Sequence, residues 1–322
     1  MGGRGGTSEG MSGIGIVNNP QARRNRLSPE TARRLGALLD GEGEVADAAT
    51  RGELAHVVER FKERAIDVLA VNGGDGTGHV VLTAFAEAYG AKPLPSIALL
   101  RGGAMNTVAD AHKLRGSPES ILRALLERRR SGEPWRTVER DLLAVEADGE
   151  PPRCGFLFGT GAVVTFLDAY YRNPSPRRAT AAGLLVRAVA STLFGGRFAA
   201  ALTAREALRV TSDGDDWPDV PFLAVLAGAV PEIGFGFTPF SRCDEQPGFF
   251  HAVGVTGSVL QVAAHLPQVW LGYPWKRSLA VDAVTRDLRI DGPVRYTVDG
   301  DLYEARRTLR VRTGPPVRLI LP

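Results

Sequence analysis

The sequence lacks the cysteine and histidine patterns of crosslinked or metal-rich proteins and the long apolar stretches of membrane-spanning ones. Its 322 residues include two cysteines, Cys154 and Cys243, and five histidines without metal-ligand spacing. Two distant cysteines argue against a disulfide framework and fit a reducing cytoplasm. No stretch approaches the roughly 20 uncharged apolar residues of a membrane span, so any contact with lipid is expected to be peripheral.

A large excess of positive or negative charge is also missing. Lys and Arg outnumber Asp and Glu by three (39 − 36), which argues against a dedicated nucleic-acid binder. Residues 1–13 are rich in Gly and Ser, which predicts a disordered lead-in and not a signal peptide. The remaining length leaves room for two domains of ordinary size.

Residues 14–134 alternate between short apolar runs and helix signals. Helix starts are predicted at Ser28-Pro29, at the Thr50 to Glu53 capping box and at Ser117-Pro118. Strands are predicted at Ile14–Asn18, Val45–Ala49, Ile66–Val71 and Ile97–Leu100. This order predicts an α/β domain with a parallel sheet covered on both faces, where ligands bind at the carboxyl ends of the strands.

Beyond about Gly132 the pattern changes to strands with helical insertions. A hairpin is predicted around Asp148-Gly149-Glu150, and a helix over Ala179–Leu202. Seven later strand-like segments follow, between Leu208 and Arg312. We therefore predict a second domain, residues 135–322, that is β-rich, antiparallel and sandwich-like.

Two glycine-rich loops follow strands of the first domain, Gly73–Thr77 and Gly102–Asn106. Glycines let backbone N–H groups approach a phosphate, and the helix after each loop adds its positive end. Asp75 would repel a bare phosphate, so it is expected to hold Mg²⁺ or to act as a base toward a hydroxyl. A tight turn explains one such loop equally well, but two at neighbouring strand ends favour a single nucleotide cleft.

A third feature, Asp299-Gly300-Asp301, lies far along the chain. Its two carboxylates could reach one cation or one proton, and a hairpin turn is a compatible explanation of the same residues. His79 lies close to the first glycine loop, although a position on a helix surface explains it equally well.

These three features in this order resemble the diacylglycerol kinase catalytic family, which includes sphingosine kinases and bacterial lipid kinases. Ile16–Pro20 is similar to its opening strand, Gly73–Thr77 equals its GGDGT motif, and Gly103–Ala109 is similar to its GT(G/A)NDFA segment. Asp299–Asp301 is similar to its DGE motif. The resemblance implies a nucleotide-binding first domain, a lipid-binding second domain, and phosphorylation of a lipid hydroxyl by ATP with Mg²⁺.

The resemblance also implies roles for individual residues. Asp75 and Asp301 are the catalytic candidates, either of which would take the hydroxyl proton, and Asp75 and Asp299 would organise Mg²⁺. The lipid would enter a pocket of the second domain lined by segments such as Gly183–Phe198. The nucleotide would contact Asn18, Gly73, Gly74, Gly76, Thr77, Gly103 and Asn106.

The sequence departs from the family pattern at four positions. Val80 stands where the family has a Glu, Ala104 replaces a Thr, Thr107 replaces an Asp, and Asp301 replaces a Glu. These departures keep a non-catalytic lipid- or nucleotide-binding relative open as an alternative. NAD kinase, which shares GGDGT, is the other alternative. We expect a cytoplasmic protein with peripheral membrane contact at most and no nucleic-acid partner, and a homodimer stays open.

Overall fold

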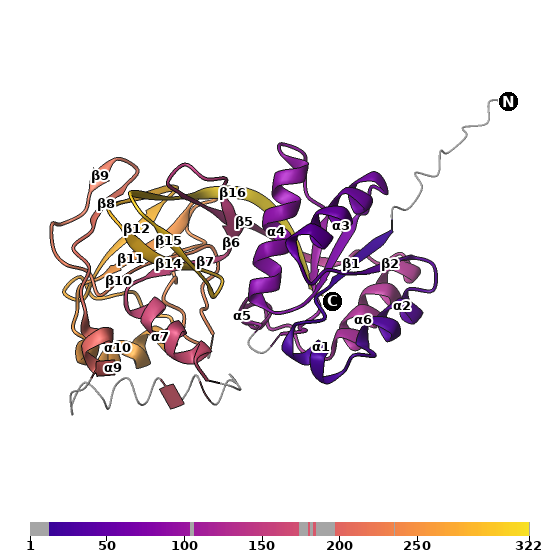
Figure 1. Ribbon diagram of the computed structural model, residues 1–322, viewed down its shortest axis with the longest axis horizontal. Helices are drawn as coiled ribbons and strands as arrows, with labels where there is room; N and C mark the ends of the chain where they lie inside the picture. Colours follow the sequence, from indigo (N-terminus) through magenta and orange to yellow (C-terminus); the bar gives the residue numbers. More distant parts are fainter. Residues whose placement is uncertain are drawn as a thin grey trace.

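The computed structural model describes residues 13–103, 106–173, 180, 183–184, 197–234 and 236–321. They form two lobes that lie side by side in Figure 1, a first lobe of residues 13–133 and a second lobe of residues 136–321. The predicted lead-in up to residue 12, Ala104, and most of the predicted helix over 179–202 and of the predicted lipid-pocket segment 183–198 lie outside the described residues.

The first lobe is built on four parallel strands in the order β2-β1-β3-β4. Alternate strand residues face opposite sides: Val17 and Leu69 join one apolar cluster, and Ile16 and Val68 join another. Helices α3 and α4 cover the first side and α2 and α6 the second, as the alternation of strands and helices predicts. The strands are β1 (Ile14–Asn18), β2 (Gly43–Asp47), β3 (Val68–Asn72) and β4 (Ser96–Leu99).

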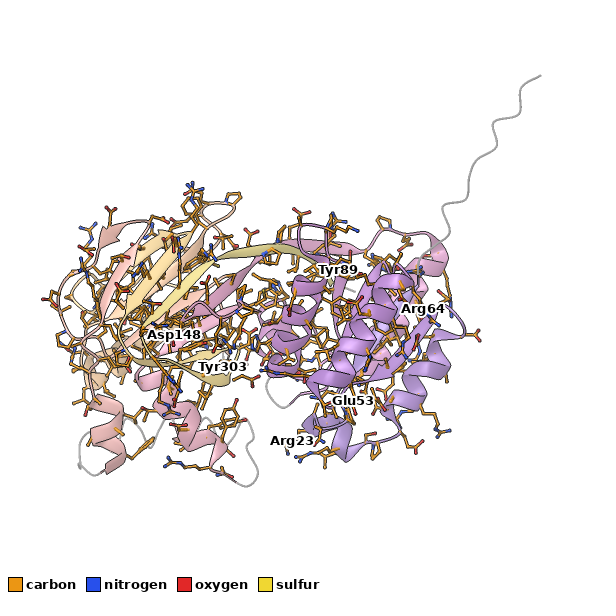
Figure 2. The ribbon with its side chains drawn as sticks, turned by 45° about the horizontal axis from the view of Figure 1, so that its top comes forward. Arg23, Glu53, Arg64, Tyr89, Asp148 and Tyr303 are labelled. Carbon is orange, nitrogen blue, oxygen red and sulfur yellow. The ribbon has the colours of Figure 1, made fainter. Side chains whose placement is uncertain are left out.

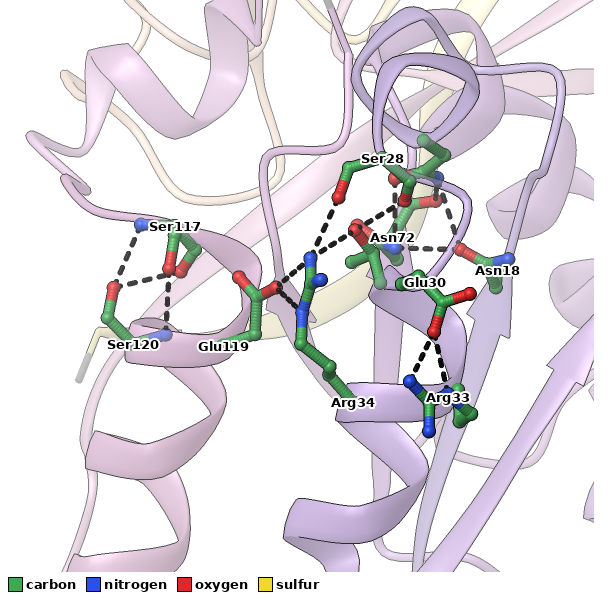
Figure 3. Close-up of polar contacts among 11 residues, drawn as sticks. Asn18, Ser28, Glu30, Arg33, Arg34, Asn72, Ser117, Glu119 and Ser120 are labelled. Carbon is green, nitrogen blue, oxygen red and sulfur yellow. Dashed lines mark hydrogen bonds and ion pairs between the residues drawn. The ribbon is translucent and has the colours of Figure 1, made fainter.

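Two of the three predicted helix starts are correct. A capping box of Thr50 and Glu53 opens α3, and Ser117 with Ser120 opens α6. The start at Ser28-Pro29 is wrong, because Ser28 ends α1 and its hydroxyl accepts a hydrogen bond from Arg34 at 2.8 Å (Figure 3). The helices are α1 (Arg23–Leu27), α2 (Thr31–Leu39), α3 (Arg51–Glu63), α4 (Asp75–Tyr89), α5 (Thr107–Ala111) and α6 (Pro118–Ser131).

The second lobe is a sandwich of two sheets. One is a six-stranded antiparallel sheet in the order β12-β11-β10-β7-β14-β15. Its strands are β7 (Leu157–Thr160), β10 (Ala224–Gly228), β11 (Phe250–Val255), β12 (Ala280–Thr285), β14 (Val294–Val298) and β15 (Asp301–Ala305). Facing it are β5 (Arg136–Ala147), β6 (Arg153–Gly155), β8 (Arg209–Ser212), β9 (Asp215–Asp216), β13 (Asp287–Asp291) and β16 (Thr308–Leu321).

The core of the sandwich is one apolar cluster with members from both sheets. Val225, Phe250 and Tyr296 come from the six-stranded sheet, and Ile290 and Val311 from the other. The predicted fold class, an α/β lobe followed by a β-rich antiparallel lobe, is confirmed. The predicted hairpin around Asp148-Gly149 is also confirmed, since β5 pairs with β6.

Strand β16 belongs to both lobes. It pairs with β5 from Leu309 to Leu321, with a register shift between Thr313 and Pro316. Its first half also pairs with β13, and Leu319 pairs in parallel with Ile97 of β4. The yellow band that crosses between the lobes in Figure 1 is this strand, so a single sheet runs through the whole molecule.

Three helices gather at one edge of the second lobe in Figure 1: α7 (Ala162–Tyr171), α9 (Arg197–Thr203) and α10 (Val259–Trp270). Apolar residues of α7 and α10 share a cluster with Leu226 and Val253 of the six-stranded sheet. Within the described ranges, no helix has both the length and the apolar character needed to cross a membrane.

Candidate active site

The two glycine loops meet at neighbouring strand ends. Strand β3 ends at Asn72, and helix α4 begins at Asp75. A Cβ atom on Gly103 would overlap the Cα of Gly74, and one on Gly73 would overlap the side chain of Thr77. Glycine is therefore required at both positions by close packing, and the loops form one continuous surface at the N-terminus of α4.

Asp75 joins the two loops by hydrogen bonds. Its carboxylate accepts one from the backbone N–H of Thr107 at 2.8 Å and one from that of Val108 at 3.3 Å. These N–H groups belong to the first turn of helix α5, where no preceding carbonyl of the helix can accept a hydrogen bond from them. Asp75 thus fixes the second glycine loop against the first, a contact that the sequence reasoning missed.

Asn106 holds the second loop from within. It has a left-handed backbone with φ of 56°, and its side chain makes two 3.1 Å hydrogen bonds with the backbone of Gly103. The side chain makes no capping bond to α5, although Asn106 occupies the N-cap position. Asparagine tolerates this backbone conformation better than most residues.

Asn18 lies beneath the loops in a buried cluster of amides. Its Oδ1 accepts from Asn72 Nδ2 at 2.7 Å (Figure 3) and from Asn25 Nδ2 at 3.1 Å. Its own Nδ2 donates to Asp47 at 2.6 Å. This network ties the ends of β1, β2 and β3 together. Asn25 and Asn72 escaped the sequence reasoning because a lone Asn carries no local signal of burial. Near this cluster, Asn19 Nδ2 donates to Thr77 Oγ1 at 2.9 Å.

The Asp299–Asp301 motif forms the hairpin between β14 and β15. Val298 pairs with Asp301, and both turn residues have positive φ, 47° at Asp299 and 97° at Gly300. Asn-Gly and Asp-Gly are the residue pairs that such two-residue turns favour. The hairpin and the functional interpretation are therefore compatible here.

Asp299 points into the protein and is 7% exposed. Its carboxylate accepts hydrogen bonds from the backbone N–H of Leu157 at 2.8 Å and of Phe156 at 3.0 Å. Burial raises the pKa of Asp299 well above its usual value, and the charge of Asp75 raises it further, although the two N–H groups oppose this.

Asp301 points the other way, toward the first lobe. A Cβ on Gly76 would come within 2.7 Å of Asp301 Oδ1, so this carboxylate lies against the first turn of α4. Burial raises the pKa of Asp301, and the positive charges that His79 and Arg51 can carry lower it by less. The charges of Asp75 and Asp301, one from each lobe, both act on the carboxylate of Asp299.

His79 links the lobes beside these carboxylates. It is buried, at 2% exposed, so the alternative of a helix-surface position is wrong. Its Nδ1 lies 2.7 Å from the carbonyl oxygen of Cys154 and its Nε2 lies 2.9 Å from the hydroxyl of Tyr303, which Figure 2 labels. A carbonyl only accepts, so Nδ1 carries the proton and Nε2 accepts from Tyr303. Burial lowers the pKa of His79, which favours this neutral form.

Cavities near the site are small. One of about 20 Å³, the room for about one water molecule, is lined by Asp75, His79, Asn106, Phe156 and Asp299 among others. A larger cavity of about 370 Å³ lies at the opposite end of the parallel sheet, around Ile14 and Glu42, away from these groups.

Metal ligands are sparse around the loops. Over the described ranges, no group of three or more His, Cys, Asp or Glu side chains is placed to hold a metal ion. Asp75 and Asp299 alone do not make a protein cage. Such a pair fits Mg²⁺ only in the way common for nucleotide enzymes, with phosphate oxygens supplying the other ligands.

Comparison with known families identifies the first lobe. Residues 14–133 match the family model described as the diacylglycerol kinase catalytic domain. This segment belongs to that family. No curated protein matches the chain.

Solved structures match the diacylglycerol kinase domain and the second lobe together. A diacylglycerol kinase from Bacillus anthracis str. Sterne aligns with a TM-score of 0.64 at 12% identity, over 97% of both chains. Two further structures from the same bacterium, described as proposed diacylglycerol kinases, align with TM-scores of 0.69 and 0.67 at 13% identity, also over 97% of both chains. At such identities the likeness shows a common fold.

The four departures from the diacylglycerol kinase pattern fall in different surroundings. Val80 is partly buried and packs against the apolar cluster under α3 and α4. Thr107 contributes its backbone N–H to Asp75, which any residue except proline supplies. Asp301 reaches Gly76 despite its short side chain, and Ala104 lies outside the described residues. The domain is that of a kinase, a phosphotransferase.

Proposed function

We propose that this protein transfers the γ-phosphate of ATP to the hydroxyl of a lipid, of a diacylglycerol-like or sphingoid-like class. The observation that carries the proposal is the contact between the first turn of α4 and the Asp299–Asp301 hairpin. It sets a phosphate-binding helix end opposite a carboxylate of raised pKa, the pair of groups that phosphoryl transfer to a hydroxyl requires.

The phosphates are assigned to the N-terminus of α4. Gly73, Gly74 and Gly76 leave the backbone N–H groups accessible, and Thr77 adds a hydroxyl. Gly103 and Asn106 extend this surface, while Asn18 holds the strand ends beneath it. Asp75 has a double task here, because it fixes α5 and is also the nearest candidate to hold a cation that enters with the nucleotide. Mg²⁺ would neutralise charge on the phosphate oxygens, with Asp75, assisted by Asp299, as its protein ligand.

The proton step is assigned to Asp301. The lipid hydroxyl oxygen bonds to the γ-phosphorus as the bond from that phosphorus to the β–γ bridging oxygen breaks. The hydroxyl proton passes to the Asp301 carboxylate, and ADP leaves. A raised pKa makes this carboxylate a stronger base than an exposed one, which supports the assignment.

The decisive experiment follows labelled γ-phosphate from ATP with Mg²⁺ onto a panel of lipids, with NAD as a separate acceptor. We expect a labelled lipid from the wild type, and none from Asp75→Asn or Asp301→Ala. Asp301→Glu should retain activity, because it keeps the base. All variants should keep the thermal stability of a folded protein.

Each other result points elsewhere. Labelled NADP would indicate an NAD kinase instead. ATP or lipid binding without any labelled product would favour a non-catalytic relative. Full activity in Asp75→Asn would overturn the site assignment.

A further inference from the structure

The C-terminal end of helix α10 presents large apolar side chains to solvent. Trp270 is 56% exposed, Leu271 63% and Tyr273 59%, all within four consecutive positions. Ile233, 43% exposed, lies in the loop that packs on the same helix end, where Gly236 contacts the Trp270 indole. Single exposed apolar residues are ordinary, but a contiguous group of this kind usually marks an interaction site.

The exposed group is held in place. The N–H and the hydroxyl of Thr238 both donate to the carbonyl oxygen of Val269, at 3.2 and 2.7 Å. After the turn at Gly272, which has φ of 77°, the buried Trp275 donates its indole N–H to the carbonyl of Pro239 at 3.0 Å. Buried residues therefore flank the exposed ones on both sides, so the fold itself presents Trp270, Leu271 and Tyr273 outward.

Positive charge follows these side chains within a few residues along the chain. Lys276 and Arg277 are exposed, and neither forms an ion pair with any described residue. The nearby acid Glu232 has its carboxylate engaged by the N–H of Gly236 at 3.0 Å. Asp282 is already held by the guanidinium of Arg242 at 2.5 Å. Aromatic and aliphatic groups are thus combined here with two cations, Lys276 and Arg277, and one acid, Glu232.

We propose that this corner docks on a membrane surface that contains anionic lipid. We call it the α10 corner, and it consists of Ile233, Trp270, Leu271, Tyr273, Lys276 and Arg277. Trp and Tyr favour the membrane–water interface, and cations beside them are attracted to anionic head groups. A two-fold contact with a second copy would bury the same apolar groups but would bring like charges together.

The proposal rests on the proposed function, because a lipid kinase has to meet its acceptor at a bilayer. The α10 corner belongs to the helical layer that also reaches the site. Helices α7 and α10 share one apolar cluster, and Tyr171 at the end of α7 donates its hydroxyl to the carbonyl of Gly300 at 3.0 Å.

The test is co-sedimentation of the whole chain with vesicles of phosphatidylcholine, alone and mixed with phosphatidylserine. We expect stronger binding to the mixed vesicles. The triple variant Trp270→Ser, Leu271→Ser, Tyr273→Ser should bind them at least ~30-fold more weakly, because it removes the apolar area that would be buried. Lys276→Glu with Arg277→Glu should remove the preference for phosphatidylserine and its dependence on salt.

Matched controls lie on the first lobe. Leu27→Ser removes an apolar side chain that is 75% exposed, and Arg123→Glu reverses an exposed charge. Neither should change vesicle binding. Equal loss of binding in these controls, or unchanged binding in the triple variant, would overturn the proposal. It would also be overturned if the wild type formed a dimer without vesicles and the triple variant were a monomer.

Failure of the proposed function is distinguishable from failure of this docking surface. The α10 corner variants should phosphorylate a short-chain lipid dispersed in detergent as fast as the wild type does. If no lipid is phosphorylated in any form but vesicle binding still depends on the corner, the surface stands and the kinase proposal falls.

Discussion

The two sides of the site are held together by different means. On the nucleotide side, Gly73, Gly74 and Gly103 pack backbone against backbone, and amide side chains tie the strand ends. On the hairpin side, a buried carboxylate, Asp299, anchors the turn to Leu157 and Phe156, which lie 142 and 143 positions earlier in the chain. The first side owes its shape to close packing, and the second to a charge held at a cost in stability. Substitutions on the nucleotide side should therefore lower the stability of the protein, and removal of the charge on the hairpin side should raise it.

The largest effect is expected where the two sides meet. His79→Ala would remove the hydrogen bonds to the Cys154 carbonyl and the Tyr303 hydroxyl, which should lower the free energy of unfolding by about 2 to 4 kcal/mol. Tyr303→Phe removes one of these bonds and should cost about 1 kcal/mol. Denaturant unfolding of both variants and of the double variant measures the coupling. Strictly additive losses would show that the two residues do not act as a pair.

The nucleotide side should tolerate no added side-chain atom. Gly103→Ala forces the two glycine loops apart and should destabilise the protein by about 1 to 3 kcal/mol while weakening ATP binding. Gly52→Ala is the matched control, since a Cβ there meets nothing within 4 Å. Calorimetry and ATP titration would report both effects. Unchanged ATP affinity in Gly103→Ala would remove this loop from the nucleotide site.

The hairpin side should gain stability when its charge is removed. Asp299→Asn keeps the oxygen that accepts from Phe156 and Leu157 but loses the repulsion from Asp75. A raised pKa means that the folded state holds this proton more tightly than the unfolded state. The stability that the proton contributes is lost as pH rises through the folded pKa.

The variant should therefore melt above the wild type, by on the order of 2 to 4 °C at neutral pH, the shift that about 1 kcal/mol causes in a chain of this size. The difference in melting temperature between the variant and the wild type should shrink toward pH 4. Melting curves at several pH values test this. A difference in melting temperature that grows toward acid pH would contradict a raised pKa of Asp299. Activity should fall in the same variant, as is common where stability and function compete.

The smallest effect concerns the two cysteines, which are both buried and belong to different apolar clusters. Burial raises the pKa of Cys154 to about 11 and that of Cys243 to about 12. At pH 8 both thiols should therefore stay protonated and resist alkylation until the protein is unfolded. Mass spectrometry after brief exposure to iodoacetamide checks this. Rapid labelling of Cys154 alone would indicate that the lobes separate around His79 in solution.

Local motifs were enough to predict the parallel sheet, the two glycine loops and the Asp299–Asp301 hairpin. Each of these is encoded within a few residues, by glycine positions, capping pairs or an apolar run. The sequence did not reveal that Asp75 caps α5, because the partners are 32 and 33 positions apart. The burial of His79 was equally hidden, since its partners Cys154 and Tyr303 come from the other lobe.

Helix α10 was missed by the sequence reasoning for a different reason. The stretch that contains α10 carries a helix signal, the capping box of Ser258 and Gln261, but Pro267 and the interruptions by Gln and His hid it. Strand β15 was also absent from the predictions, although the turn before it was recognised. Its Asp301–Ala305 segment carries Glu304 on the exposed side, and only pairing with β14 shows that it is a strand.

The path of β16 bears on the order in which this chain acquires its structure. β4 leaves the ribosome about two hundred residues before β16, a delay of roughly 10 to 40 seconds at ordinary rates of synthesis. Until then the edge of β4 that receives Leu319 is open, and an open edge invites pairing with other chains. The segment that carries the kinase motifs therefore depends on a strand made long after it, and expressed without that strand it should be prone to aggregate.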